Sequence, residues 1–265
     1  MKTLSIGMPT LIEMPGIAEC ASFCVKNGLH FVELNMNLPE YQLDRINENA
    51  IAKALQDHGI YCTLHLDENF NICDFNPLVS EAYRQTVFQA IQIAKRHEMP
   101  IINMHLHGGV HFKLPGHKVF LFEKYEKEYM HALRTFRDLC EEAIGTSALK
   151  ICIENTDGFA EYEQRGIELL LESSAFALTL DIGHNHCANN ADSAFYQRQT
   201  DRLYHMHIHD ANAETCHLPF GTGELNLREA LTLAICQKCR AVVEVKTVSG
   251  LLQSLPMLNK LLITL

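Results

Sequence analysis

The stretch Leu203-Tyr204-His205-Met206-His207-Ile208-His209-Asp210 carries three histidines at every second position. Because successive side chains of a strand point to opposite faces, the three imidazoles share one face. Tyr204, Met206 and Ile208 are expected on the other face, against whatever packs outside the sheet. A soluble protein gains little from three imidazoles on one strand face unless that face borders a polar cavity. The stretch therefore predicts a β-strand that lines such a cavity.

Seven more short segments rich in β-forming residues occur along the chain, and each is followed by room for a helix. Together with the histidine strand, the predicted strands are Leu4–Met8, His30–Asn35, Ile60–Leu66, Pro100–His107, Leu149–Glu154, Phe176–Asp181, Leu203–His209 and Ala241–Val245. Strands that alternate with helices pair in parallel, with each crossover helix on the outside of the sheet. Eight such units within 265 residues fit an α/β fold of the closed (β/α)₈ TIM barrel type better than an open sheet.

Local signals agree with this layout. Asn76 can cap a helix whose first turn holds Pro77. An apolar stripe at helical spacing follows at Val79, Tyr83, Val87, Ile91 and Ala94. Gly28 and Gly59, each just before a predicted strand, are typical of helix C-terminal ends. No Gly-x-Gly-x-x-Gly follows the first strand, and no linker divides the chain, so we expect one TIM barrel domain over residues 1–265.

Composition restricts the partners of the chain. The sequence has 22 Lys and Arg against 32 Asp and Glu, which gives a net charge of −10. Nucleic acid is therefore not an expected partner, because contacts to phosphates need a basic surface. The sequence has no apolar run of signal-peptide or membrane-spanning length, and its ten cysteines are scattered through apolar segments. These features predict a cytoplasmic protein with reduced thiols and no membrane partner.

Seven of the eight predicted strands end in a titratable side chain. Active sites of TIM barrels lie at these C-terminal strand ends. Buried carboxylates and imidazoles without partners are costly, and one divalent cation could satisfy several of them. Glu154, Asp181, Glu244 and one histidine of the histidine strand would form a hard, oxygen-rich site. Such a site favours Mn²⁺, Mg²⁺ or Co²⁺, and Zn²⁺ also fits because imidazole suits it.

Five strings in the second half of the chain resemble the sugar phosphate isomerase/epimerase family of the xylose isomerase-like TIM barrel superfamily. They are Ile153-Glu154-Asn155-Thr156, Leu180-Asp181-Ile182-Gly183-His184, His207-Ile208-His209-Asp210, His217-Leu218-Pro219-Phe220-Gly221-Thr222-Gly223 and Glu244-Val245-Lys246. This superfamily includes ketose 3-epimerases, inosose dehydratases and metal-dependent apurinic endonucleases. The resemblance extends over essentially the whole chain, and it implies a metal-dependent enzyme.

The resemblance also implies roles for individual residues. The implied metal ligands are Glu154, Asp181, His207 and Glu244. His207 is preferred to His209 because the family pattern is His-x-[Lys/Asn/His]-Asp. Strand geometry alone does not separate the two histidines, because both point inward and lie one strand repeat of about 7 Å apart. The implied substrate contacts are Glu33, His65, His105 (or His107), His184, His209 and His217. Glu33 has a second interpretation, an inward strand residue paired with a neighbouring histidine. The remaining loop or helix histidines are expected at the solvated surface, namely His58, His97, His111, His117 and His131.

The implied activity is that of a metal-dependent isomerase or epimerase acting on a small sugar or cyclitol, with an inosose dehydratase-type lyase as a related reaction. Glu154 and Glu244 end strands on opposite sides of the barrel, so they are the expected acid and base around a metal-stabilised enediolate. Two alternatives are a zinc-dependent phosphodiesterase or apurinic endonuclease and a non-catalytic sugar-binding barrel. The endonuclease pattern has an Asp two residues before the loop histidine, where this chain has Thr215. Dimers are common among relatives, so a homodimer is one alternative, and the sequence leaves the oligomeric state open.

Overall fold

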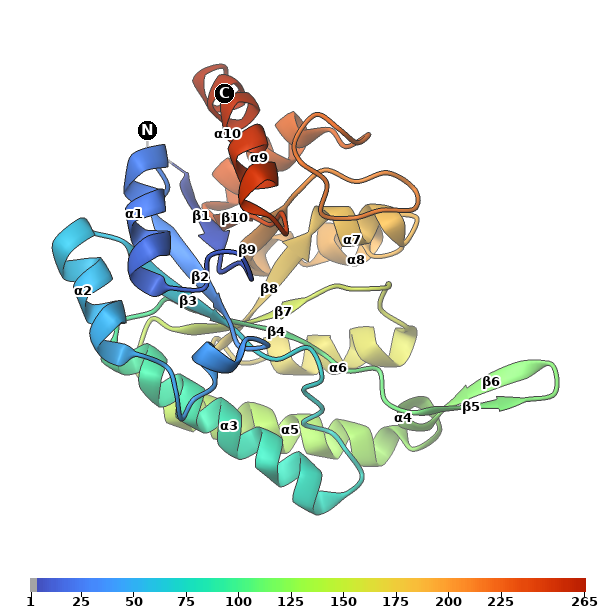
Figure 1. Cartoon of the computed structure of the whole chain (residues 1–265). Coiled ribbons are helices and arrows are strands. Elements are labelled where there is room, and N and C mark those ends of the chain that lie inside the picture. Colours follow the sequence, from blue (N-terminus) through green and yellow to red (C-terminus); the bar gives the residue numbers. More distant parts are fainter. Residues whose placement is uncertain (1–3) are drawn as a thin grey trace.

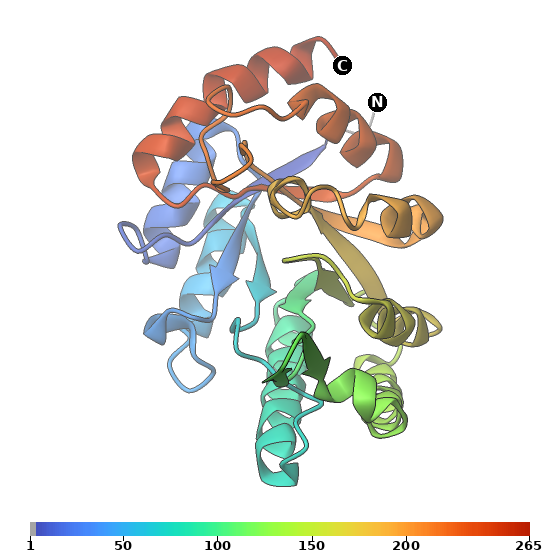
Figure 2. The ribbon, with the colours of Figure 1, turned by 90° about the vertical axis from the view of Figure 1, so that its right-hand side faces the viewer.

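The computed structural model describes residues 4–265 and contains a closed barrel of parallel strands in the order β1-β10-β9-β8-β7-β4-β3-β2. Helices form a ring around the strands, as the predicted (β/α)₈ TIM barrel requires (Figures 1 and 2). The barrel strands are β1 (Ser5–Pro9), β2 (Phe31–Asn35), β3 (Tyr61–His65), β4 (Ile101–His105), β7 (Lys150–Glu154), β8 (Phe176–Asp181), β9 (Leu203–Ile208) and β10 (Arg240–Val243). The predicted fold class is therefore confirmed.

The surrounding helices begin and end where the local signals indicate. Asn76 caps α3 by accepting a hydrogen bond from the Leu78 N–H, and Gly28 and Gly59 end α1 and α2 in the left-handed conformation. The helices are α1 (Ile17–Asn27), α2 (Glu48–His58), α3 (Pro77–Arg96), α4 (Leu121–Lys124), α5 (Glu126–Ile144), α6 (Glu161–Leu171), α7 (Ile182–Cys187), α8 (Ser193–Arg198), α9 (Leu227–Gln237) and α10 (Val248–Ile263), with 3₁₀ turns η1 (Pro39–Tyr41) and η2 (Thr200–Arg202). Within residues 4–265, no helix has the length and apolar character needed to cross a membrane.

One element was not predicted, the antiparallel hairpin of β5 (His111–Leu114) and β6 (His117–Phe120). His111 and His117 therefore lie in strands, and their expected place on loops or helices is wrong. Part of the signal was present in the sequence, because polar and apolar residues alternate in His111-Phe112-Lys113-Leu114, directly before a Pro115-Gly116 turn. The hairpin projects from the ring of helices and is not part of the barrel (Figure 1).

The histidine strand departs from strict alternation at its beginning. The register between β8 and β9 shifts, so that Leu178 pairs with Leu203 and Thr179 pairs with His205. Tyr204 is the extra residue of this bulge. It packs against Ile101 and the other inward residues Cys152 and Ala177, under the Arg240 guanidinium. The expected outward position of Tyr204 is therefore wrong, whereas Met206 and Ile208 do join the outer apolar core.

Candidate functional site

Four acidic and imidazole side chains converge at the C-terminal end of the barrel. Glu154 ends β7, Asp181 ends β8, His207 lies in β9 and Glu244 follows β10. All four are buried, and one possible ligand atom from each lies within 4.8 Å of the others. Residues separated by up to 90 positions meet here because the barrel brings the carboxyl ends of its parallel strands to one mouth.

His207 stands at the centre of this group. Its Nδ1 atom lies 2.9 Å from Glu154 Oε1, 3.1 Å from Glu244 Oε2 and 3.9 Å from Asp181 Oδ2. Burial alone would lower the pKa of His207, but Glu154, Glu244 and Glu33 outweigh it and raise the pKa well above its ordinary value. Neither His207 Nδ1 nor Glu244 Oε2 has a hydrogen-bond partner of good geometry within the described chain, although both are buried. Such unsatisfied atoms are costly, and a cation among them would satisfy both.

Each carboxylate is held by partners at its other oxygen. Glu154 Oε2 accepts a hydrogen bond from the Asn103 amide and lies 3.2 Å from His65 Nε2 and 3.3 Å from His105 Nε2. Glu244 Oε1 lies 2.9 Å from Lys246 Nζ. The glutamates therefore present Oε1 of Glu154 and Oε2 of Glu244 toward His207, in a geometry that their neighbours fix. A divalent metal ion fits this donor set of three carboxylates and one imidazole.

Asp181 is fixed by the helix that follows it. As the cap of α7 it accepts a hydrogen bond from the His184 N–H at 2.7 Å, and it accepts a second from His209 Nε2 at 2.9 Å. His209 Nδ1 in turn accepts from the His217 N–H at 2.8 Å. Both nitrogens of His209 are thus occupied, which leaves His207 as the strand histidine whose Nδ1 faces all three carboxylates. A Cβ atom at Gly183 would lie 1.9 Å from His209 Cε1, so glycine is required for this close approach.

Glu33 lies beneath the four converging residues. It is 2% exposed and accepts hydrogen bonds from Thr63 Oγ1 at 2.9 Å, His205 Nε2 at 2.9 Å and His207 Nε2 at 2.7 Å. Burial alone would raise the pKa of Glu33, but His205 and His207 lower it well below its ordinary range. Glu33 is not among the residues that line the cavity above, and its contacts correspond to the histidine-paired interpretation. It orients His207 in the way that a carboxylate orients a metal-binding histidine.

A polar cavity of about 510 Å³ opens above the four residues. Of the predicted substrate contacts, it is lined by His65, His105, His184 and His217, whereas Glu33 and His209 lie below its floor. Burial, the largest influence on His217, lowers the pKa of its imidazole to about 4, so this group is neutral at pH 7. The lining residues that were not predicted as contacts are Asn35, Glu68, Asn69, Leu106, Gly108, Thr156, Asp157 and Lys246, with His107 as the alternative to His105. Of these residues, Lys246 is the one that the sequence could have predicted. It follows Glu244 by two positions, and alternation places both side chains at the barrel mouth.

Three further groups of side chains have metal-binding geometry, and one of them is the group of Glu33, His205 and His207 described above. His184, His209 and His217 approach one another closely, and His65 joins Glu154 and His207 in another group. The His209 and His217 ring centroids are 4.3 Å apart, and those of His184 and His217 are 5.1 Å apart. Buried clusters able to bind a metal therefore occupy much of the barrel mouth.

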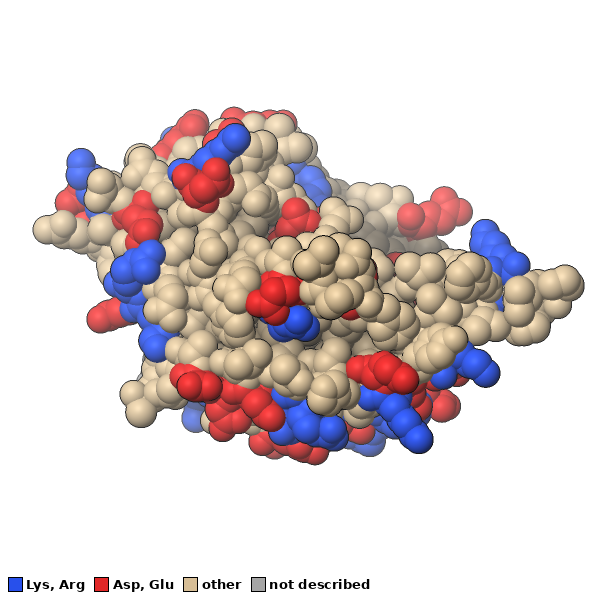
Figure 3. All heavy atoms as spheres, turned by 90° about the horizontal axis from the view of Figure 1, so that it is seen from below, with Lys and Arg blue, Asp and Glu red and all other residues tan. Residues whose placement is uncertain are grey.

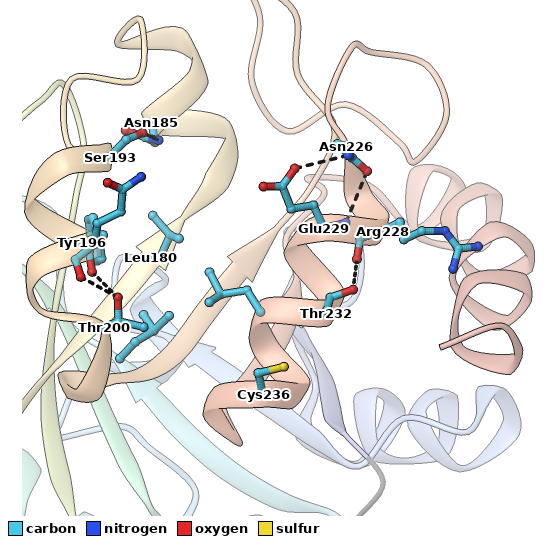
Figure 4. A pocket seen from close by; sticks show the side chains of 13 residues that line it. Leu180, Asn185, Ser193, Tyr196, Thr200, Asn226, Arg228, Glu229, Thr232 and Cys236 are labelled. Carbon is cyan, nitrogen blue, oxygen red and sulfur yellow. Dashed lines mark hydrogen bonds between the residues drawn. The ribbon is translucent and has the colours of Figure 1, made fainter.

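A larger hollow of about 730 Å³ lies elsewhere, between α8 and α9 on the outside of the barrel (Figure 4). Leu180, Leu203 and Leu233 form its apolar wall. Its charged lining residues are Arg228 and Glu229, and it contains no group of acidic and imidazole side chains among the described residues. The chemistry is therefore concentrated at the barrel mouth and not in this outer hollow.

Comparisons with known proteins agree with the fold. An uncharacterised protein of Methanocaldococcus jannaschii, MJ1614, is 26% identical over 177 residues, which cover 64% of this chain and 64% of that protein. The chain thus matches less than two thirds of that relative's length. A D-tagatose 3-epimerase-like protein superimposes with a TM-score of 0.79 at 18% identity over 98% of both chains. The 3-keto-D-glucoside 4-epimerase YcjR of E. coli superimposes with a TM-score of 0.77 at 13% identity over 98% of this chain and 99% of that one.

At these identities the two solved structures establish a shared fold and no more. The model of the xylose isomerase-like TIM barrel family, in contrast, matches residues 21–234, which is most of the sequence. That match agrees with the closed barrel and its strand order. The chain belongs to the xylose isomerase-like TIM barrel family.

Proposed function

We propose that the protein is a metal-dependent isomerase or epimerase of a small sugar or cyclitol, with Glu154 and Glu244 as its acid–base pair. The observation that carries this proposal is the position of two glutamates on either side of one histidine nitrogen, at the floor of a polar cavity. Glu154 Oε1 and Glu244 Oε2 lie 2.9 Å and 3.1 Å from His207 Nδ1. The sugar epimerases with the same fold support this choice of substrate class.

The residues that would hold the ion are Glu154, Asp181, His207 and Glu244. Three carboxylates favour Mn²⁺, Mg²⁺ or Co²⁺, and the imidazole also allows Zn²⁺. When bound, such an ion supplies Lewis acidity, which makes a hydrogen beside a sugar carbonyl more acidic. The fit rests on the two unsatisfied buried atoms, His207 Nδ1 and Glu244 Oε2.

The second oxygen of each glutamate would carry out the proton transfer, exchanging one of its present hydrogen-bond partners for the substrate proton. Glu154 Oε2 is next to His65 and His105, and Glu244 Oε1 is next to Lys246, and all three neighbours line the cavity. Glu154 Oε2 takes the proton from the carbon beside the carbonyl and later releases it to solvent. Glu244, which is ionised in the resting site, takes up a solvent proton at Oε1 and delivers it to the opposite face of that carbon, which inverts it. A single glutamate that removes and returns the proton at neighbouring carbons would instead interconvert an aldose and a ketose.

Electrostatics favour ionised glutamates that can accept a proton. Burial alone would raise the pKa of Glu244, but His207 and Lys246 hold it well below its ordinary value. Burial would likewise raise the pKa of Glu154, and His207 and His105 lower it. The cavity histidines are left to hydrogen-bond the hydroxyl groups of the substrate, which suits a compact polyol.

Isotope exchange tests this function. The purified protein is analysed for bound metal and incubated in D₂O with a panel of ketoses, aldoses and cyclitols. We expect deuterium at the carbon next to the carbonyl of the converted sugar, because only proton removal at that carbon exchanges it with solvent. If sugars of the panel bind to the protein but none takes up deuterium, the result would support a non-catalytic sugar-binding barrel. The isomerase proposal would then be abandoned.

A hydrolase is the second candidate, because three further groups of side chains besides the four ligands have metal-binding geometry. Several zinc ions at the mouth would suit a phosphodiesterase. The net charge of −10 argues against a nucleic acid substrate. Cleavage of bis(p-nitrophenyl) phosphate by the zinc-loaded protein, without isotope exchange in any sugar, would favour this candidate.

Replacing Glu33 with Gln is expected to weaken metal binding by about 10- to 100-fold, as is typical when the partner of a metal-binding histidine is removed. The amide keeps the shape of Glu33 but loses the charge that orients His207 through its Nε2 atom. Isothermal titration with Mn²⁺ measures the affinity. Thr63→Val, which removes only the hydroxyl that donates to Glu33, is the control and should have a smaller effect. An unchanged affinity in Glu33→Gln would mean that Glu33 does not support a metal ligand.

A further inference from the structure

A second layer of polar side chains lies inside the barrel, one strand repeat below the mouth. We call it the lower layer, and each of its members precedes a residue at the mouth by two positions. All of them are 2% exposed or less, and none lines the cavity. The members of the lower layer are Glu33, Thr63, Asn103, Thr179 and His205. Asn103 and Thr179 form a part of this layer that does not contact Glu33, and they lie below Glu154.

Asn103 connects Thr179 to Glu154. Its side-chain nitrogen donates a hydrogen bond to Glu154 Oε2, and its Oδ1 atom accepts one from Thr179 Oγ1 at 2.5 Å. The low pKa of Glu154, which burial opposes and His207 and His105 cause, keeps its carboxylate ionised. Because an ionised carboxylate can only accept hydrogen bonds, the amide nitrogen must face Glu154 and the amide oxygen must face Thr179. The Asn103 amide therefore has one orientation, with a donor at each end of the chain of bonds directed toward Glu154.

Thr179 is itself held in place from both sides of the sheet. Its backbone pairs with Glu154 in β7 and with His205 in β9. On the outside of the barrel, the hydroxyl group of Tyr196 on α8 donates a hydrogen bond to the Thr179 carbonyl oxygen at 2.6 Å. The Thr179 hydroxyl thus has a fixed position from which it orients the Asn103 amide.

Three groups surround Glu154 Oε2, and Asn103 differs from the other two. His65 Nε2 at 3.2 Å and His105 Nε2 at 3.3 Å belong to side chains that line the cavity, so a substrate can displace them. Asn103 is completely buried below the cavity, so its amide keeps its place when a substrate enters. Because a carboxylate is planar and rigid, a bond that fixes Oε2 also fixes Oε1, which faces His207 Nδ1 at 2.9 Å.

We propose that Asn103 and Thr179 are positioning residues that give the two oxygens of Glu154 separate roles. Oε1 is directed to the ion site at His207, and Oε2 is directed to the reacting carbon of the substrate. The role of Oε2 rests on the proposed function, whereas the role of Oε1 concerns metal binding alone. Without the Thr179 hydroxyl, Asn103 Oδ1 would be a buried acceptor with no donor, so the amide would turn toward another partner and release Glu154.

The variants Thr179→Val and Thr179→Ser isolate the hydroxyl group, because Val keeps the branched shape and Ser keeps the hydroxyl. Thr179→Val should lower kcat by about 10- to 100-fold, the usual effect of removing a partner that orients a metal ligand. The KM for the sugar should change little, because neither Thr179 nor Asn103 lines the cavity. Thr179→Ser should restore a kcat close to that of the unmodified protein.

Thr135→Val is the matched control for the loss of a threonine hydroxyl. Thr135 is exposed on α5, where its hydroxyl bonds only to the His131 carbonyl oxygen of the same helix. This helix belongs to the lower face of the molecule, where Lys and Arg are interspersed with Asp and Glu (Figures 1 and 3). The control should retain both the kcat and the metal affinity of the unmodified protein.

The affinity for Mn²⁺, measured by isothermal titration, gives a readout that does not depend on turnover. Thr179→Val and Asn103→Leu should each weaken binding by about tenfold. Adding Thr179→Val to Asn103→Leu should have little further effect, because Thr179 acts through Asn103. Thermal unfolding verifies that each variant folds.

Three results would overturn the proposal. They are an unchanged kcat and Mn²⁺ affinity in Thr179→Val, equal losses in Thr179→Val and Thr179→Ser, and additive losses of affinity in the double variant. Equal losses in the two single variants would mean that packing, and not the hydroxyl, is responsible. If the unmodified protein converts no sugar, the proposed function fails, and the Mn²⁺ affinities still decide whether Asn103 and Thr179 position Glu154.

Discussion

Glu154→Gln and Glu244→Gln are each expected to lower turnover of the accepted sugar or cyclitol by about a thousandfold, within the range of general acid–base catalysis. Gln keeps the size of the side chain and one oxygen atom, so the barrel should still fold. It cannot accept the proton that leaves the substrate carbon. Initial rates under saturating metal and substrate measure the loss, and circular dichroism verifies the fold.

The two variants should differ in isotope exchange if each glutamate serves one side of the carbon. Glu154→Gln should block both exchange and conversion. Glu244→Gln should still exchange the hydrogen with D₂O while forming little inverted product. Glu141→Gln on the outer helix α5 is the matched control and should turn over like the unmodified protein. Substantial activity in both site variants would remove Glu154 and Glu244 from the mechanism.

The sequence predicts the barrel well because its signal is local and repeated. Two-residue alternation and the caps of α3, α1 and α2 locate the elements to within one or two residues along most of the chain. The errors arise where alternation is interrupted or was overlooked. The bulge at Tyr204 adds a residue to β9 and turns that side chain inward. The hairpin of β5 and β6 alternates only in its first strand, which is short and lies between a barrel strand and a helix.

The site is less predictable, because its contacts join distant positions. Resemblance selects His207 over His209, but only the closed barrel shows that His209 is occupied by Asp181 and the His217 N–H. Glu33 approaches His207 across 174 positions of sequence, from a strand on the far side of the barrel. No spacing rule predicts that pairing. From the residues alone, Glu33 could be interpreted either as a buried partner of His207 or as a substrate contact.

Metal affinity is expected to rise by about tenfold for each pH unit near neutral pH, hence by about a hundredfold from about pH 6 to about pH 8. Both nitrogens of His207 face carboxylates, since Nε2 lies 2.7 Å from Glu33 Oε1 and Nδ1 lies 2.9 Å from Glu154 Oε1. Carboxylates only accept hydrogen bonds, so in the metal-free protein His207 Nδ1 carries a proton toward the facing glutamates, although no glutamate oxygen is aligned with it in a hydrogen bond of good geometry. The raised pKa of His207, which burial opposes and Glu154 and Glu244 cause, means that this proton is present at neutral pH.

Binding of a divalent ion requires the loss of that proton, and a higher pH makes the loss easier, which gives the positive sign of the dependence. Titration calorimetry in two buffers of different ionisation enthalpy should count about one proton released per ion. His207→Gln is the control, because Gln does not titrate, and its weaker binding should vary less with pH. An affinity that is flat over this pH range, with no proton released, would mean that the ion does not bind at His207 Nδ1. The position of His207 opposite three carboxylates would then need another explanation.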